Sequence, residues 1–282
     1  MSRIVEVAVD GGPYALAAGS DGAMWVTLVH RGAIARIAGS GDAEVYPVAE
    51  DSRPSIITAG PDGALWFTRA GDDRIGRIST AGELSEFELR AGSAPFGITA
   101  GPDGALWYTA MGTGVVGRIT VDGEIDEVIA PGGTPSMITT GPDNALWFTL
   151  NRANAIGRLD GGVVTLRKVP TPGAGPVGIA GTHDDAVWFT ASLADKVGRI
   201  PMNEAVQELD LPGKPHAVIA DPSGGVWVSL WGTDQIARVH ADGDVAAIDL
   251  PADSEPHGLA IGPDGALWVA LEAGFVMRLP TV

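Results

Sequence analysis

The chain has 282 residues, of which 45% are hydrophobic, a formal net charge of −17 and no cysteine. This charge argues against a nucleic-acid partner, because lysine and arginine must neutralise phosphate, and without cysteine the chain forms neither disulfides nor reactive thiols. No apolar signal core follows Met1 and no segment approaches membrane-spanning length, so we expect a cytoplasmic protein with no membrane partner, folded as one domain over residues 1–282.

Tryptophan recurs at nearly constant spacing along the chain. The gaps between successive copies are 41, 41, 40, 41, 39 and 41 residues, and the copies are Trp25, Trp66, Trp107, Trp147, Trp188, Trp227 and Trp268. A period of about 40 residues built from short strands and tight turns is typical of β-propeller blades. The repeat therefore predicts an all-β, seven-bladed β-propeller. The alternative that a repeat of this kind leaves open is a β-solenoid.

Each repeat carries the same residues around its tryptophan. A proline stands twelve residues before it in every copy: Pro13, Pro54, Pro95, Pro135, Pro176, Pro215 and Pro256. Turns such as residues 60–63 (GPDG) come just before it, and glycine accepts the positive φ that such turns need. An arginine follows it by 11 residues in six copies and by 10 in the last: Arg36, Arg77, Arg118, Arg158, Arg199, Arg238 and Arg278. We interpret the tryptophans, these arginines and the turn residues Asp62, Asp103 and Asp264 as structural.

The second repeat illustrates the expected strands. Four antiparallel strands are predicted at about residues 55–58, 64–68, 74–78 and 84–89. The last repeat stops after its third strand, whereas residues 3–9 resemble the fourth strands elsewhere, such as residues 205–211. We therefore expect the N-terminal strand to complete the seventh blade, which leaves the ring no long open edge. A closed ring needs no partner chain, so we expect a monomer.

The repeat allows one position to be compared across all blades. The residue after the repeated proline is, in order, Tyr14, Ser55, Phe96, Ser136, Val177, His216 and His257. Two of the five histidines thus share this position in neighbouring blades. The residue before the proline is acidic only at Glu255, and the fourth residue after the tryptophan is acidic only at Glu272. The remaining histidines share no position and are interpreted as surface residues: His30, His183 and His240.

The topology of a blade predicts that these positions meet. Connections from the fourth strand to the first, and from the second to the third, lie on the same face of the ring. His216, Glu255, His257 and Glu272 should therefore cluster at the axial mouth, on blades six and seven. The last repeat is one residue shorter beside Glu272, which indicates a re-aimed loop.

Two carboxylates without cysteine indicate a hard cation, and Mg²⁺ takes oxygen ligands of this kind. A neutral imidazole beside the cation is able to transfer protons near neutral pH. This combination suits removal of a proton next to a carbonyl, with the cation stabilising the enolate. It also suits activation of water, as in a metal-dependent lactonase or esterase. A non-catalytic binding propeller with a polar mouth is a further alternative.

Five short segments carry a pattern more specific than the repeat itself. They are Gly12-Pro13-Tyr14, Lys214-Pro215-His216-Ala217, Leu230-Trp231-Gly232, Glu255-Pro256-His257-Gly258 and Ala270-Leu271-Glu272. Together with the seven-fold repeat, which many propellers share, they resemble the streptogramin B lyase family, also called the virginiamycin B lyase family. The resemblance covers essentially the whole chain.

This resemblance implies a carbon–oxygen lyase that confers antibiotic resistance. Such an enzyme linearises a small cyclic depsipeptide, a type B streptogramin, by elimination at the ring ester, with Mg²⁺ as cofactor. The resemblance implies that Glu255 and Glu272 hold the Mg²⁺ and that His257 is the catalytic base, assisted by His216 at the metal or the substrate. The residues implied to bind the substrate are Tyr14, His216 and Trp231.

Overall fold

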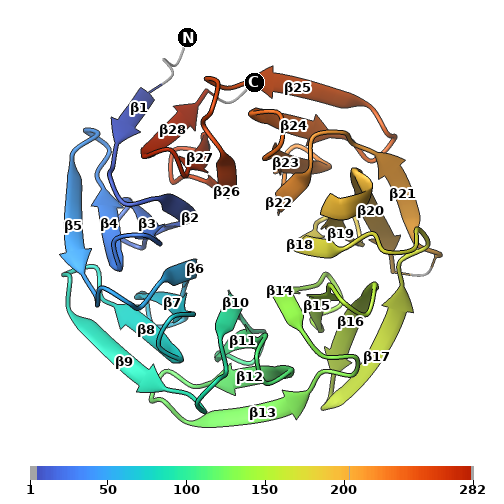
Figure 1. The fold of residues 1–282 in the computed structure, drawn as a ribbon, viewed down its shortest axis with the longest axis horizontal. Helices are drawn as coiled ribbons and strands as arrows, with labels where there is room; N and C mark the ends of the chain where they lie inside the picture. Colours follow the sequence, from blue (N-terminus) through green and yellow to red (C-terminus); the bar gives the residue numbers. More distant parts are fainter. Residues whose placement is uncertain (1–4, 203, 281–282) are drawn as a thin grey trace.

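The computed structural model describes residues 5–202 and 204–280. Seven four-stranded antiparallel sheets stand around a central axis, and each presents one strand to the axis and one to the outer rim (Figure 1). This arrangement is the seven-bladed β-propeller that the tryptophan period predicts. Residues Ser192–Ala194 form a short 3-10 helix, η1, and no helix in the described part of the chain is long and apolar enough to cross a membrane.

The strands occupy equivalent places in every blade. The innermost strands are β2 (Pro13–Ala18), β6 (Pro54–Ala59), β10 (Pro95–Ala100), β14 (Pro135–Thr140), β18 (Pro176–Thr182), β22 (Pro215–Ala220) and β26 (Pro256–Ile261). The second strands are β3 (Met24–Leu28), β7 (Leu65–Arg69), β11 (Leu106–Ala110), β15 (Leu146–Leu150), β19 (Ala186–Ala191), β23 (Val226–Leu230) and β27 (Leu267–Leu271). The third strands are β4 (Ala33–Ile37), β8 (Arg74–Ile78), β12 (Val115–Ile119), β16 (Ala155–Asp160), β20 (Lys196–Pro201), β24 (Gln235–Val239) and β28 (Phe275–Leu279). The outer strands are β5 (Ala43–Pro47), β9 (Leu84–Glu88), β13 (Ile125–Ile129), β17 (Val163–Lys168), β21 (Gln207–Asp210), β25 (Val245–Asp249) and β1 (Val5–Ala8).

The two ends of the chain share the seventh blade. Strand β1 pairs antiparallel with β28, with Val5 opposite Arg278 and Ala8 opposite Phe275. The sheet order β1-β28-β27-β26 confirms that the N-terminal strand supplies the outer strand of this blade. Positions 3 and 4 of the expected strand lie outside the described residues. Closure by backbone pairing removes the free edge that an open ring would expose.

In the first four blades the tryptophan donates a hydrogen bond to the turn aspartate, which in turn accepts one from the arginine of the repeat. In blade two, Trp66 is fully buried, and its Nε1–H donates to Asp62 at 3.0 Å. The other oxygen of Asp62 accepts a hydrogen bond from Arg77 at 2.7 Å, and the guanidinium lies 5.9 Å from the centre of the Trp66 ring. The buried indole therefore has a hydrogen-bond partner and a stacked cation, as a structural role requires.

Every innermost strand begins with the same backbone irregularity. The residue before the repeated proline has a positive φ in all seven blades, including 52° at Lys214 and 51° at Glu255. The pairing with the second strand then shifts register, between Pro215 and Val218 in blade six and between Pro256 and Leu259 in blade seven. Bulges of this kind re-aim side chains and are common beside functional sites. The residue after the proline lies within the irregularity in every blade.

Hydroxyl groups fix the backbone of these irregular segments from the neighbouring blade. Thr190 of blade five donates to the carbonyl oxygen of His216 at 2.7 Å. The same hydroxyl oxygen accepts the backbone N–H of Gly178 at 2.8 Å. Equivalent bonds run from Thr27 to Ser55 at 2.8 Å and from Thr149 to Val177 at 2.8 Å. The strand starts around the axis are therefore set by contacts between blades.

Candidate active site

Three aromatic side chains meet where the irregular strand starts of blades one, six and seven converge. The rings of His216 and His257 are perpendicular, with their centres 4.8 Å apart. The ring of Tyr14 lies 4.7 Å from that of His257 and 6.3 Å from that of His216. Each residue directly follows the repeated proline of its blade, so three identical positions of the repeat supply the three rings.

The Glu272 carboxylate joins two histidines from different blades. Its Oε2 atom lies 2.5 Å from Nε2 of His257, and its Oε1 atom lies 2.7 Å from Nε2 of His30. Because a carboxylate only accepts hydrogen bonds, both Nε2 atoms must carry the proton in this arrangement. The side chain of Glu272 is 21% exposed, whereas that of His257 is 10% exposed. One carboxylate thus connects the buried imidazole to the surface.

The backbone places both glutamates in the same corner of blade seven. The N–H of Glu272 donates to the carbonyl oxygen of Glu255 at 3.1 Å. The chain before Glu255 is held in turn by Asp234 of blade six, whose carboxylate accepts the N–H groups of Asp253 and Glu255 at 2.9 and 3.0 Å. The connection after β27 is one residue shorter than its counterparts in the other blades, which agrees with the re-aimed loop expected beside Glu272.

Burial sets the protonation of the two central histidines. Burial lowers the pKa of His257 to about 4, helped by nearby His30. Burial, and then the neighbouring His257, lower the pKa of His216 to about 3. Burial, and then the Glu272 carboxylate, raise the pKa of the Tyr14 hydroxyl well above its usual range. All three side chains are therefore uncharged at neutral pH, and the two imidazoles have the lone pair that a base requires.

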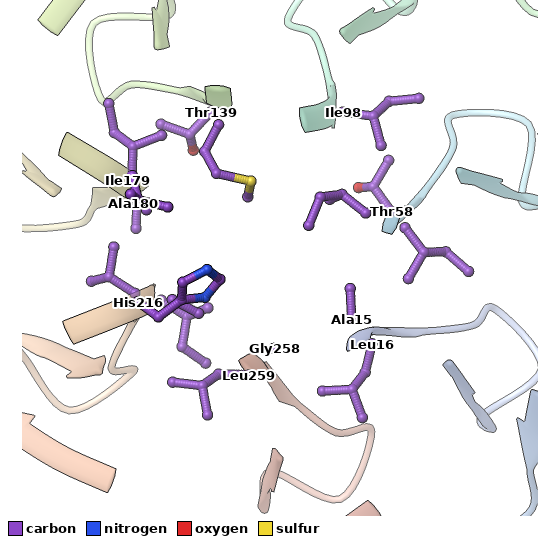
Figure 2. A pocket seen from close by; sticks show the side chains of 18 of the residues that line it. Ala15, Leu16, Thr58, Ile98, Thr139, Ile179, Ala180, His216, Gly258 and Leu259 are labelled. Carbon is purple, nitrogen blue, oxygen red and sulfur yellow. The ribbon is translucent and has the colours of Figure 1, made fainter. Parts of the chain in front are cut away.

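A cavity continues from these residues along the propeller axis. It has a volume of about 320 Å³ and is lined mainly by apolar residues of the innermost strands, including Leu16, Ile98 and Ile179. Figure 2 shows the imidazole of His216 pointing into this space. The Nδ1 atoms of His216 and His257 are buried and have no hydrogen-bond partner. The mouth of the propeller therefore has polar side chains next to a cavity that is mainly apolar.

Trp231 forms part of the rim of the same site. It follows β23 directly and is 40% exposed, which is unusual for so large an apolar side chain. The ring centre of Trp231 lies 6.2 Å from that of His257. The Nζ atom of Lys214 lies 5.2 Å from the ring centre of Trp231. An exposed aromatic face beside a buried imidazole is suited to contact with an organic ligand.

The carboxylates of this corner fit a magnesium ion. Within residues 5–202 and 204–280, no three His, Asp or Glu side chains are gathered into a ready ligand set. Mg²⁺, however, is usually bound through one or two carboxylates and keeps several waters. The hydrogen bond from His30 and the contact with His257 use two of the roughly four lone-pair positions of Glu272. Glu255 is exposed and shares a backbone hydrogen bond with Glu272, so two acidic residues stand side by side in one corner of the mouth.

The structure brings together most of the residues that the sequence singled out. His216, His257, Tyr14, Trp231 and Glu272 surround one point, whereas Glu255 joins them through its backbone. His30 is exposed, as a surface residue should be, but that interpretation missed its contact with Glu272. No position shared between repeats identifies His30. The signal that could have pointed to it is the glycine pair at residues 11–12, because a bare backbone leaves room for a ring.

The fold and the site together define a class of protein. A closed seven-bladed propeller carries neutral imidazoles, a bridging carboxylate and an exposed indole at one axial mouth, above an apolar cavity. The sequence profile of the virginiamycin B lyase family matches residues 2–279. A virginiamycin B lyase of Mycobacterium sp. strain KMS is 71% identical over 283 residues, which cover 99% of this chain and 100% of that protein. The chain belongs to the virginiamycin B lyase family.

Solved structures of this family have the same fold. Virginiamycin B lyase from Staphylococcus aureus superposes with a TM-score of 0.94 and 36% identity, over 99% of both chains. A catalytically inactive histidine-to-alanine variant of that enzyme, solved with quinupristin, gives a TM-score of 0.94 and 35% identity over 99% of both chains. A streptogramin B lyase structure superposes with a TM-score of 0.93 and 34% identity, over 98% of this chain and 97% of that one.

Proposed function

We propose that this protein is a magnesium-dependent lyase that linearises type B streptogramins by elimination at the ring ester. Family membership supports the class of reaction. The observation that carries the proposal for this chain is the buried, neutral imidazole of His257, 2.5 Å from a carboxylate. The inactive relative solved with quinupristin lacks a histidine, which fits a reaction that depends on an imidazole.

His257 is the proposed base. Its Nδ1 atom is buried, so Nε2 is the nitrogen available to a ligand at the mouth. Because Nε2 carries the proton that faces Glu272 in this structure, the imidazole first shifts to its other neutral tautomer, with the proton on Nδ1, and Nε2 then accepts a proton from the substrate. The imidazole removes the α-proton of the threonyl residue of the ring, and the electron pair forms a double bond to the β-carbon. The bond between the β-carbon and the ester oxygen breaks, and the carboxylate leaves, so no water is consumed.

Glu255 and Glu272 are the proposed ligands of Mg²⁺. When bound, the cation supplies positive charge that stabilises the negative charge developing on the substrate carbonyl oxygen. The low pKa values of His216 and His257, about 3 and 4, keep these imidazoles neutral beside such a charge. A protonated histidine would repel the cation and would have no lone pair to accept the α-proton.

The remaining residues bind and orient the ring. His216, held through its carbonyl oxygen by Thr190, is the proposed hydrogen-bond donor to a substrate oxygen. Tyr14 lies beside both histidines and contacts the substrate from blade one. The exposed indole of Trp231 offers an aromatic surface to the same ligand. Binding a reactant in the correct orientation accounts for a large part of the rate gain in reactions of this kind.

Metal removal tests this proposal. The protein is treated with EDTA, freed of chelator, and incubated with quinupristin before and after addition of Mg²⁺. We expect ring opening only with Mg²⁺, and a product with a carbon–carbon double bond where the threonyl residue stood, visible by NMR. Equal rates in the metal-free protein would contradict the role of the cation. A product with an intact threonyl hydroxyl would show hydrolysis instead.

A further inference from the structure

We propose that His30 is a positioning residue for the Glu272 carboxylate and thereby sets the affinity of the site for a divalent cation. The inference rests on the proposed function, in which Glu272 is a metal ligand. His30 belongs to blade one, in the connection between β3 and β4, whereas Glu272 follows β27 in blade seven. The contact crosses from the first blade to the last, over 242 positions of sequence.

The contact completes a two-sided hold on the carboxylate. Nε2 of His30 lies 2.7 Å from Oε1 of Glu272, whereas His257 contacts the other oxygen. A single contact leaves a carboxylate free to rotate about its last bond, whereas a contact on each of its two oxygens restricts that rotation. Each oxygen keeps a further lone pair for a cation. The hold therefore orients Glu272 without using up its capacity as a ligand.

A glycine makes room for the His30 ring. A β-carbon on Gly12 would lie 2.3 Å from Cδ2 of His30, closer than real atoms approach. Gly12 also has a φ of 69°, which disfavours a side chain. It occupies the same position in blade one that Glu255 occupies in blade seven. At this position blade one therefore provides space, which the imidazole fills, whereas blade seven provides a carboxylate.

The backbone anchors the loop that carries His30. The N–H of His30 donates to the carbonyl oxygen of Gly11 at 2.9 Å, and the N–H of Val29 donates to Gly12 at 3.0 Å. The side chain is 59% exposed, so its placement comes from these bonds and from the contact with the Gly12 backbone. Hydrogen-bond partners that orient a metal ligand typically change metal affinity by about 10–100-fold when removed.

The test compares two substitutions of His30 with a matched control. Calorimetry with Mg²⁺ alone is run on wild-type protein, His30→Ala, His30→Gln and His183→Ala, which removes another exposed histidine. We expect about a tenfold or greater loss of Mg²⁺ affinity in His30→Ala. His30→Gln, which retains an N–H donor at similar reach, should recover much of that loss. His183→Ala should equal wild type, and all four melting temperatures should agree.

A second pair of variants fills the space beside Gly12 instead of removing the His30 imidazole. Gly12→Ala should displace His30 and weaken Mg²⁺ binding as His30→Ala does. Gly175→Ala is the control, because Gly175 occupies the same position in blade five with a φ of 62° and faces Leu193 instead of a histidine. It carries the same backbone strain and should leave Mg²⁺ affinity unchanged.

Three outcomes overturn the inference and are distinguishable. Wild-type affinity in both His30→Ala and Gly12→Ala, with ring opening of quinupristin intact and magnesium-dependent, would remove His30 from the site and leave the proposed function standing. Absence of Mg²⁺ binding by wild-type protein, together with ring opening that survives EDTA, would overturn both the role of His30 and the proposed magnesium-dependent function. An affinity loss in His30→Gln as large as in His30→Ala would show that the hydrogen bond is not what positions Glu272.

Discussion

The backbone N–H of Glu272 donates to the carbonyl oxygen of Glu255 across 3.1 Å. The two acidic residues, 17 positions apart in sequence, therefore belong to one hydrogen-bonded corner of blade seven. Their backbone positions are therefore fixed relative to each other. This relationship supports the proposal that both carboxylates bind a single cation, and substituting one residue at a time separates their contributions.

Glu272→Gln should weaken Mg²⁺ binding without unfolding the protein. The amide keeps the size of the side chain but has no charge and one acceptor oxygen fewer. Its position at the mouth, 21% exposed, means that no buried charge is left behind. Calorimetric titration with Mg²⁺ measures the effect, and the circular dichroism melting curve serves as the control. Equal affinity in the variant and the wild type would refute the assignment of Glu272 as a ligand.

Asp234→Gly, a change in the neighbouring blade six, should weaken Mg²⁺ binding at the proposed site. Asp234 accepts N–H groups of the segment that leads to Glu255, and glycine suits its φ of 50°. Asp73→Gly is the matched control, because Asp73 has a φ of 53° and accepts the N–H groups of Gly92 and Ala94 at 2.7 Å. Both variants should lose on the order of 1–2 kcal/mol of stability. Only Asp234→Gly should lower Mg²⁺ affinity; equal Mg²⁺ affinities in the two variants would contradict the positioning of Glu255.

His257→Ala should abolish ring opening while the protein still binds quinupristin. The substitution removes the only proposed base and leaves the exposed Trp231 and the Tyr14 side of the mouth in place. Turnover is measured by chromatography, and binding by the change in tryptophan fluorescence. A variant that turns over at the wild-type rate would exclude His257 as the base. Loss of both quinupristin binding and turnover would instead assign His257 to substrate recognition.

The stability of the protein should fall as the pH falls, in part through His216. Burial holds its pKa at about 3, against about 6.5 for an ordinary histidine. Between these values the unfolded chain binds a proton that the folded protein does not, so acid favours unfolding by about 1.4 kcal/mol per pH unit. Between pH 7 and pH 5, the free energy of unfolding of His216→Asn should therefore fall by about 2 kcal/mol less than that of the wild type. Denaturant unfolding measures this difference, with His183→Asn as the control; identical pH slopes would contradict the prediction.

The fold was predictable because one large residue marks every blade. Each tryptophan has a proline and an arginine at nearly the same distance in sequence. In blade two, Asp62 accepts the hydrogen bond of Trp66, and Arg77 lies over its ring. Sequence spacing and three-dimensional structure therefore carry the same information. The closing strand was predictable for a similar reason, since the outer strand missing from blade seven had a counterpart at the N-terminus.

The site was predictable only where the repeat itself varies. Comparison of equivalent positions singled out His216, His257, Glu255 and Glu272, and topology predicted their common face. His30 was missed because its contact depends on empty space at Gly12, and the glycine pair at residues 11–12 was not interpreted as room for a side chain. The register shift at the start of each innermost strand was also missed, because it arises from backbone geometry that proline and its neighbours impose together.

The mass of the product tests the central claim most directly. Purified protein is incubated with quinupristin and Mg²⁺, and the linear product is weighed by mass spectrometry. Elimination by the His257 imidazole predicts an opened ring with the same mass as the cyclic substrate. A product heavier by one water, or a ring that stays closed after prolonged incubation, would contradict the claim.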